Sequence, residues 1–341
     1  MRVAEVVEVL RAARNLARDN VRRGEEVLVL SSTDQHASIH DALLAACEEA
    51  GAGRVASLLL VPEPLRAGYR HPEMALAAAR AADLTIVATS LAFPRAYDDM
   101  TEAVLSAGRR LVLINNAPPE DFARGASLAD PAALSAATWR LAKAVSAARQ
   151  VRVRTAAGTD LTVGVCRPCM ALTGHADDHT GFGSFPSGEA MLSVEEGTAE
   201  GRFVADAFGQ VVYLEGRGPQ IGMIEDPIVL QFRAGRLTDL SGGAAAARLR
   251  AILNAADEGA GCLAELGLGT NPMARRIAHV ENKFRLGTAH IALGDNHLIG
   301  WRAARELGGT LHSGRHIDLV ADDVTVELDG QVVVADGRLL V

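Results

Sequence analysis

Residues 24–33 read GEEVLVLSST, an apolar run that ends in small polar side chains. Similar runs lie near residues 55–61, 83–89 and 110–115, and segments with helical periodicity separate them. Strand-like runs that alternate with helices indicate βαβ units and hence a parallel sheet. We therefore expect residues 1–150 to form a Rossmann-like α/β domain with a mainly parallel, doubly wound sheet.

The sequence changes character at Val151. Residues 151–165, VRVRTAAGTDLTVGV, alternate polar and apolar side chains on either side of a turn at Gly158. Short strand-like pieces follow, with one helix near residues 244–258 and Asp-Gly turns typical of hairpins at the end. We predict that residues 151–341 form a β-rich α+β domain, which carries the metal site inferred below.

The composition argues against several classes of function. Asp and Glu number 42 against 34 Lys and Arg, so the net charge is −8, and only 4% of the residues are aromatic. Nucleic-acid binding needs a basic surface, and single-strand binding needs stacking aromatics, so we expect no nucleic-acid partner. No run of about 18 uncharged apolar residues occurs, which argues against a membrane-spanning protein. The N-terminal segment predicts an amphipathic helix and not a signal peptide, so we expect a cytoplasmic protein.

The strongest chemical signal lies in the C-terminal part of the chain. Residues 311–320, LHSGRHIDLV, place His316 and Asp318 two positions apart in a strand-like segment. Alternate residues of a strand point to one face, so an imidazole and a carboxylate converge there and suit a divalent metal. Four more candidate residues lie upstream: Glu265, Glu281, His290 and His297. Together these features predict a metalloenzyme.

Other motifs give weaker signals. Cys166 and Cys169, in CRPC, have the spacing of half a zinc site, but the chain has no second cysteine pair, which favours coincidence. Residues 175–179, HADDH, are consistent with a metal-facing or substrate loop, and equally with an ordinary solvated loop. The N-terminal half lacks both the G-x-G-x-x-G and the Walker motifs, so the sequence does not support a nucleotide cofactor.

Several motifs also occur in an order that resembles a known family. The blocks are GTDLTV, FPSGEA, TAEG, AELGLGTNP, LGTAHIALGDN and RHIDLV, all within residues 151–341. They resemble the thermophilic, aminopeptidase T-type metallopeptidases. They are also similar to a sister group that shares the fold, 2,5-dihydroxypyridine 5,6-dioxygenase. Both groups assemble into oligomers, so the resemblance implies a homodimer or a higher closed oligomer.

In the aminopeptidases, two metal ions are held by acids, histidines and a tyrosine within these blocks. The position of the tyrosine is taken here by His297, which is itself a good metal ligand. The carboxylate that takes a proton from the metal-activated water falls on Glu281, with a bridging Glu265 as the alternative. The resemblance thus implies a dinuclear Zn, Co or Mn site with these ligands: Glu189, Glu265, His290, His297, His316 and Asp318.

The dioxygenase instead holds one Fe(II) with two histidines and an aspartate. Its last histidine and aspartate correspond to His316 and Asp318, but its other histidine falls on Glu265, and it lacks counterparts of Glu189 and His290. This comparison favours a hydrolase that cleaves the N-terminal amide bond of a short peptide or a related small molecule. A mononuclear Fe(II) ring-opening dioxygenase is the first alternative, and a non-enzymatic, metal-stabilised binding protein is the second.

Overall fold

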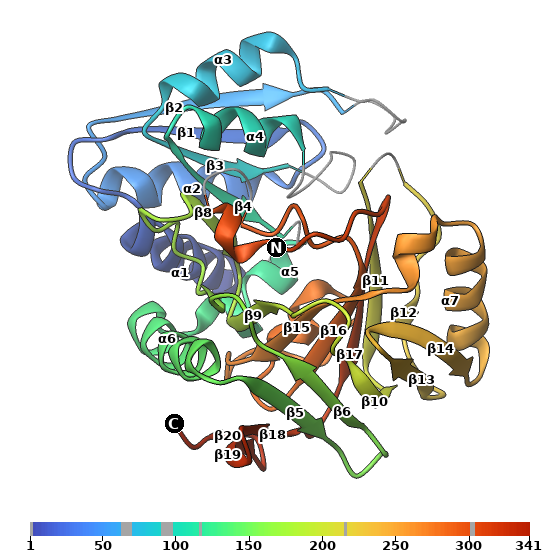
Figure 1. The fold of residues 1–341 in the computed structure, drawn as a ribbon. Coiled ribbons are helices and arrows are strands. Elements are labelled where there is room, and N and C mark those ends of the chain that lie inside the picture. The colour runs from blue at the N-terminus through green and yellow to red at the C-terminus, as the bar shows by residue number, and fades with distance from the viewer. Residues whose placement is uncertain (1–2, 63–69, 90–97, 116–117, 215–216, 301–303) are drawn as a thin grey trace. The chain divides into compact units, whose positions relative to one another are not determined.

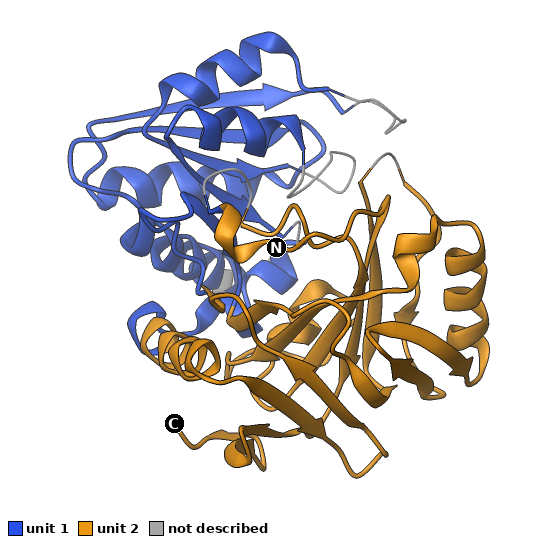
Figure 2. Ribbon diagram, viewed as in Figure 1, with its two compact units in different colours: residues 1–133, 172–187, 301–304 blue, residues 134–171, 188–300, 305–341 orange. Residues whose placement is uncertain are grey.

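The computed structural model describes residues 3–62, 70–89, 98–115, 118–214, 217–300 and 304–341. Figure 1 shows the helices and strands along the chain. The chain divides into two compact units, which Figure 2 colours separately. Unit 1 comprises residues 1–133, 172–187 and 301–304, and unit 2 comprises residues 134–171, 188–300 and 305–341. Each unit is thus assembled from segments that are distant in sequence, and a domain boundary near residue 150 remains a prediction.

Unit 1 contains a five-stranded sheet, sheet A, in the order β2-β1-β3-β4-β8. All of its neighbouring strands are parallel, as expected. The strands are β1 (Glu26–Ser32), β2 (Arg54–Leu60), β3 (Leu84–Ala88), β4 (Arg110–Ile114) and β8 (Phe182–Phe185). The helical elements are α1 (Val3–Asn20), α2 (Ala37–Glu49), α3 (Glu73–Ala81), α4 (Asp99–Ser106), α5 (Pro119–Phe122) and η1 (Gly125–Leu128). Strands β3 and β4 are buried throughout, which explains why both read as continuous apolar runs.

Unit 2 contains two antiparallel sheets. Sheet B has eight strands in the order β14-β13-β10-β6-β5-β18-β19-β20. Its strands are β5 (Gln150–Arg154), β6 (Asp160–Gly164), β10 (Glu200–Ala205), β13 (Ile228–Arg233), β14 (Arg236–Ser241), β18 (Thr325–Leu328), β19 (Gln331–Ala335) and β20 (Arg338–Leu339). Asp329 and Asp336 adopt φ values of 48° and 50° at the last two turns, and each precedes a glycine with positive φ. Such Asp-Gly pairs fit the tight hairpin turns predicted from the sequence.

Sheet C has seven strands in the order β12-β11-β17-β16-β15-β9-β7. Its strands are β7 (Met170–Leu172), β9 (Glu189–Ser193), β11 (Phe208–Tyr213), β12 (Gly222–Met223), β15 (Leu263–Gly269), β16 (Ala289–Gly294) and β17 (Arg315–Ala321). The remaining helical elements are α6 (Pro131–Ala147), α7 (Ala244–Asn254), η2 (Glu258–Gly261), η3 (Val280–Phe284) and η4 (Arg305–Leu307). The parallel sheet and the β-rich second unit therefore give the mixed α/β fold that the sequence predicts.

The main core of unit 2 lies on one face of sheet C. A single cluster of buried apolar side chains includes residues of sheet B, sheet C, α6 and α7. On β17 it takes Ile317 and Leu319, and on β15 it takes Leu266 and Leu268. Because side chains alternate along a strand, the residues between these positions face the other side of the sheet. The chemistry-bearing residues of unit 2 lie on that second face.

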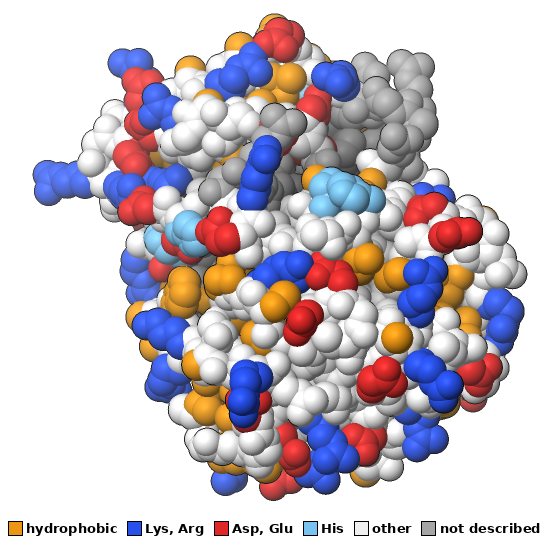
Figure 3. All heavy atoms as spheres, viewed as in Figure 1, with side chains coloured by type: hydrophobic (Ala, Val, Ile, Leu, Met, Phe, Trp, Pro, Cys, Tyr) orange, Lys and Arg blue, Asp and Glu red, His pale blue; other side chains and the backbone are white. Residues whose placement is uncertain are grey.

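The outer surface is mixed in charge. On the face shown in Figure 3, Asp and Glu side chains are interspersed with Lys and Arg side chains. None of the helices in the described part of the chain is long and apolar enough to span a membrane. The site described below is not part of this surface, because its residues are buried.

Truncation of the core face should destabilise unit 2. Leu319 is fully buried, so Leu319→Ala should lower the free energy of unfolding by about 2–5 kcal/mol through lost burial and the cavity left behind. Val332 is 37% exposed, and Val332→Ala should change the same quantity by about 0.5 kcal/mol or less. Urea unfolding monitored by circular dichroism measures both values. Equal effects of the two substitutions would contradict the assignment of this face to the core.

Candidate metal centre

The register of sheet C brings distant residues onto one face. Asp318 of β17 pairs with Ala292 of β16, and Ala292 also pairs with Glu265 of β15. Residues in direct register across antiparallel strands project to the same face, so both carboxylates flank the small Ala292 side chain. Since alanine fills little space, the two carboxylates can approach each other above it.

Three buried side chains form the centre of this face. Donor atoms of Glu265, His316 and Asp318 all lie within 4.8 Å of one another. The His316 Nε2 atom is 3.7 Å from Glu265 Oε2 and 3.4 Å from Asp318 Oδ1. Each of the three residues is at most 4% exposed. One nitrogen and two oxygen donors at this spacing suit a divalent metal ion.

Unpartnered oxygens support the same interpretation. Within the described part of the chain, Glu265 Oε2 and Asp318 Oδ1 are buried and have no hydrogen-bond partner. A buried carboxylate oxygen without a partner carries a desolvation penalty, and a bound cation removes it. The residues present therefore fit a metal ion at this position.

Hydrogen bonds to neighbouring residues fix the orientation of His316 and Asp318. The His316 Nδ1 atom lies 2.9 Å from the backbone carbonyl of Asp295, so in the neutral ring Nδ1 carries the proton and the lone pair of Nε2 faces the carboxylates. Gln210 Nε2 donates to Asp318 Oδ2 at 3.2 Å, so the other carboxylate oxygen, Oδ1, faces His316. Metal-ligating histidines commonly donate their second ring N–H to a carbonyl in this way.

Glu265, His316 and Asp318 also shift one another's pKa values. Burial lowers the pKa of His316, but the adjacent carboxylates of Asp318 and Glu265 outweigh burial and raise it to about 9. Burial acts to raise the pKa of Asp318, yet the positive charges of Lys283 and His316 hold it far below its usual range. Without a metal ion, a proton on His316 thus takes part of the role of the cation.

Three more buried residues, Glu189, Lys283 and His290, adjoin the group of Glu265, His316 and Asp318. His290 Nε2 lies 2.9 Å from Glu265 Oε1, and His290 Nδ1 lies 3.6 Å from Glu189 Oε2. The Lys283 Nζ atom lies 3.5 Å from Glu189 Oε1 and 3.6 Å from Asp318 Oδ2. Burial raises the pKa of Glu189 more than its neighbours Lys283 and His290 lower it. These residues orient Glu265 and add a third buried carboxylate.

The structure thus brings most of the predicted residues together. Five of them contact one another on the same face: Glu189, Glu265, His290, His316 and Asp318. Glu281 instead accepts hydrogen bonds from the backbone and guanidinium of Arg275, at 2.8 to 3.2 Å. An ion-paired carboxylate of this kind is poorly suited to the role of proton acceptor that the resemblance assigned to Glu281.

His297 belongs to a different group. Its Nδ1 atom lies 2.6 Å from Asp295 Oδ2, and its ring stacks on that of His312 with centroids 3.9 Å apart. Donor atoms of these three residues lie within 4.8 Å of one another, but two of the three are exposed. Asp295 Oδ2 also accepts from the backbone N–H of Ser313, so this carboxylate is already engaged within the protein. His297 does not join the donors of Glu265, His316 and Asp318 in a common group.

Lys283 is the residue that the sequence reasoning missed. It lies in η3, a 3-10 segment whose residues show no strand alternation, so its position could not be inferred from periodicity. The available signal was compositional. The chain has only two lysines among its 34 basic residues, Lys143 and Lys283, and Lys143 is exposed on α6. A lysine in so arginine-rich a chain, two residues from Glu281 in a motif-rich region, is a candidate for a specific role.

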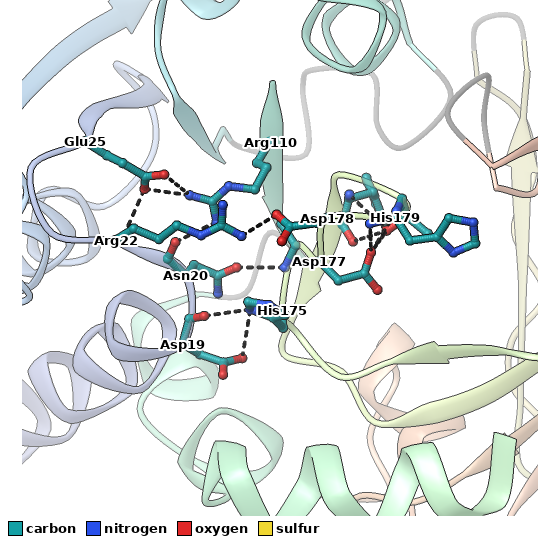
Figure 4. Close-up of polar contacts among 12 residues, drawn as sticks. Asp19, Asn20, Arg22, Glu25, Arg110, His175, Asp177, Asp178 and His179 are labelled. Carbon is teal, nitrogen blue, oxygen red and sulfur yellow. Dashed lines mark hydrogen bonds and ion pairs between the residues drawn. The ribbon is translucent and has the colours of Figure 1, made fainter. Parts of the chain in front are cut away.

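The HADDH segment has a structural role in unit 1. Figure 4 shows that His175 and Asp178 lie beside the C-terminal end of α1, and that Asp177 faces the backbone of its own loop. His175 Nδ1 lies 2.6 Å from the carbonyl of Asp19, and Asp178 pairs with Arg22. Asp177 Oδ1 accepts from the backbone N–H groups of residues 179 and 180. These contacts fix the loop ahead of β8.

The cysteine motif does not assemble a site with other donors. Cys166 is exposed and Cys169 is buried, and both are free thiols. Neither belongs to a group of three or more metal-donor residues in the part of the chain that the structure describes.

Comparisons with known proteins agree with this architecture. The model of the 2,5-dihydroxypyridine 5,6-dioxygenase family matches residues 8–341. The 2,5-dihydroxypyridine dioxygenase of Pseudomonas putida KT2440 superposes with a TM-score of 0.75 and 22% identity, over 100% of this chain and 98% of that chain. Wild-type AmpT from Thermus thermophilus superposes with a TM-score of 0.62 and 18% identity, over 97% and 99%. Comparison with the curated proteins gives no match. The resemblance to both groups is thus confirmed, and it extends across both units.

Gly267 is required for the position of His290. The two residues pair across β15 and β16, and a Cβ atom at Gly267 would lie 1.9 Å from Cε1 of His290. Gly267→Ala should therefore displace the imidazole from Glu265, reduce metal affinity and lower the free energy of unfolding by about 1–3 kcal/mol. Gly261→Ala is the matched control, because no atom lies within 4 Å of its added Cβ. Unchanged metal affinity in Gly267→Ala, measured by calorimetric titration, would show that His290 has no part in the site.

Metal binding should release a proton. Because the pKa of His316 is raised to about 9, the metal-free ring is protonated at neutral pH, and a metal ion must displace that proton. Apparent Mn²⁺ affinity should then rise about tenfold per unit between about pH 6 and pH 8, and level off above the pKa. Titrations in buffers of different ionisation enthalpy measure both affinity and proton release. A Mn²⁺ affinity that does not change between pH 6 and pH 8 would contradict the assignment of His316 as a ligand.

Proposed function

This chain belongs to the 2,5-dihydroxypyridine 5,6-dioxygenase family, and on that premise we propose that it is a mononuclear non-haem Fe(II) dioxygenase that opens a dihydroxylated ring. The observation that carries the proposal is the buried group of Glu265, His316 and Asp318 within a family match over nearly the whole chain. Members of the family and both solved relatives are enzymes, so an enzymatic function is shown. The ring-opening alternative is thus better supported than the hydrolase that the sequence favoured.

The donor set fits one iron ion with a modified ligand composition. Ferrous oxygenases commonly use two histidines and one carboxylate on one face of the metal and leave other positions open. This chain offers one histidine and two carboxylates, which are also good ligands for Fe(II) and Mn(II). When bound, a ferrous ion supplies the dioxygen chemistry and a binding point for the ring hydroxyl groups.

The protein residues then hold and prepare the site. The Asp295 carbonyl orients the His316 ring, and the Gln210 amide orients Asp318. Glu189 is the carboxylate best suited to accept a proton from a substrate hydroxyl, because burial raises its pKa and its Oε2 atom accepts no hydrogen bond from the described residues. Since Glu189, His316 and Asp318 are buried, water is largely excluded from them.

A hydrolase remains the second candidate because of one specific observation. Glu189 and His290, which the resemblance assigns to the aminopeptidase ligand set, lie in the same buried cluster as the three central donors. A site that bound two metal ions through all five residues would favour amide hydrolysis by a metal-activated water. The number of metal ions bound per chain therefore separates the two functions.

Oxygen uptake tests the proposal directly. Protein loaded with Fe(II) under anaerobic conditions should consume oxygen when it is mixed with dihydroxylated aromatic and pyridine rings, starting with 2,5-dihydroxypyridine. Asp318→Ala should lose bound iron and reduce turnover by at least about 100-fold, because it removes a ligand. Asp239 is an exposed carboxylate on β14, so Asp239→Asn should leave the bound iron and the turnover unchanged. Peptide hydrolysis by the Zn-loaded or Co-loaded protein, without oxygen uptake in the Fe-loaded protein, would overturn the proposal.

A further inference from the structure

Lys283 lies at the centre of the buried acidic face. Its Nζ atom is 3.5 Å from Glu189 Oε1, 3.6 Å from Asp318 Oδ2 and 3.5 Å from His290 Nε2. The lysine side chain is only 11% exposed. Lysine is rarely buried to this extent unless its charge is compensated, so the position needs an explanation beyond packing.

The charge of the site supplies that explanation. Glu189, Glu265 and Asp318 are three carboxylates on one buried face. One ammonium group and one divalent ion together balance three carboxylates, whereas two divalent ions beside the ammonium would leave the buried site strongly positive. Because uncompensated buried charge is costly, the presence of Lys283 favours one metal ion over two.

While the ammonium group is present, the donors around it are spaced for an ammonium group. Donors around Lys283 lie about 3.5 Å from Nζ, whereas metal–ligand bonds are about 2.0–2.2 Å long. The groups of described residues whose donors lie within 4.8 Å of one another include Glu265, His316 and Asp318 but neither Glu189 nor His290. Glu189 and His290 thus stand outside the group whose donors converge on one point, although His290 Nε2 lies 3.9 Å from Asp318 Oδ1.

We propose that the Lys283 ammonium occupies the place of a second cation, so that this site takes a single divalent ion, and that its removal creates a two-metal site with Glu189 and His290 as new ligands. Asp318 lies between the two positions, since one of its oxygens faces Lys283 and the other faces His316. The inference rests on the metal centre of the proposed function, but not on its oxygen chemistry.

Metal stoichiometry tests this inference. Wild-type protein saturated with Mn²⁺ and then dialysed should retain one ion per chain by elemental analysis, with the six-line paramagnetic resonance spectrum of an isolated ion. Lys283→Met keeps the side chain as far as Cε and removes the ammonium group with its charge. It should retain two ions per chain and show the broadened spectrum of an exchange-coupled pair.

Two further variants serve as controls. Lys283→Arg keeps the positive charge and should retain one ion. The double variant Lys283→Met with Glu189→Gln removes one positive and one negative charge, and it also removes a ligand of the second site, so it should return to one ion. Because its charge stays balanced, the double variant also shows whether loss of the lysine itself prevents folding.

The possible outcomes separate the two proposals. Two ions in the wild-type protein, or one ion in folded Lys283→Met, would overturn the inference about Lys283. One ion in the wild-type protein and two in Lys283→Met, without oxygen uptake on any ring, would leave that inference standing and overturn the proposed function. A wild-type protein that retains no metal ion would overturn both.

Discussion

Three carboxylates buried on one face of sheet C are the constraint on which the rest of the site depends. Transfer of an unpaired carboxylate from water into a protein interior is strongly unfavourable, so each needs a positive partner. Lys283 lies beside Glu189 and Asp318, and a divalent ion held beside His316 would supply the remaining positive charge. The opposite face of the same strands packs against the main core, and this packing holds the backbone that positions the charged groups.

Part of this site follows from the local pattern of the sequence. The H-x-D spacing at His316 and Asp318 predicts two donors on one face of a strand, and the structure places both on β17. The contributions of Glu189, Glu265 and His290 could not be found in this way, because their convergence depends on the register of three separate strands. The sequence offered Glu265 and His290 as candidates without placing them together, and motif resemblance assigned all three to one site. Similarly, four strands of sheet A follow from alternation along the chain, but β8 does not, since its partner β4 is distant in sequence.

The different surroundings of Glu281 and Lys283 have a common physical origin. Glu281 and Lys283 are two residues apart in η3, where a 3-10 turn sends neighbouring side chains in different directions. The acid pairs with Arg275, and the lysine reaches the buried carboxylates. A search for metal ligands and catalytic acids in the sequence selects the glutamate and passes over the lysine, because a cation is not expected among metal donors. The need for a buried positive charge follows only when the three carboxylates that the fold brings together are counted.

Glu265 and Lys283 are best understood as a linked pair. The resemblance to the dioxygenase implies a neutral histidine at the position of Glu265, and a glutamate there adds one negative charge to the metal centre. That extra charge would raise the cost of burial and favour a second metal ion, as in a dinuclear hydrolase. The Lys283 ammonium, beside Asp318, offsets the added charge without adding a metal. A site with the carboxylates of an aminopeptidase can in this way retain the single metal ion of a dioxygenase.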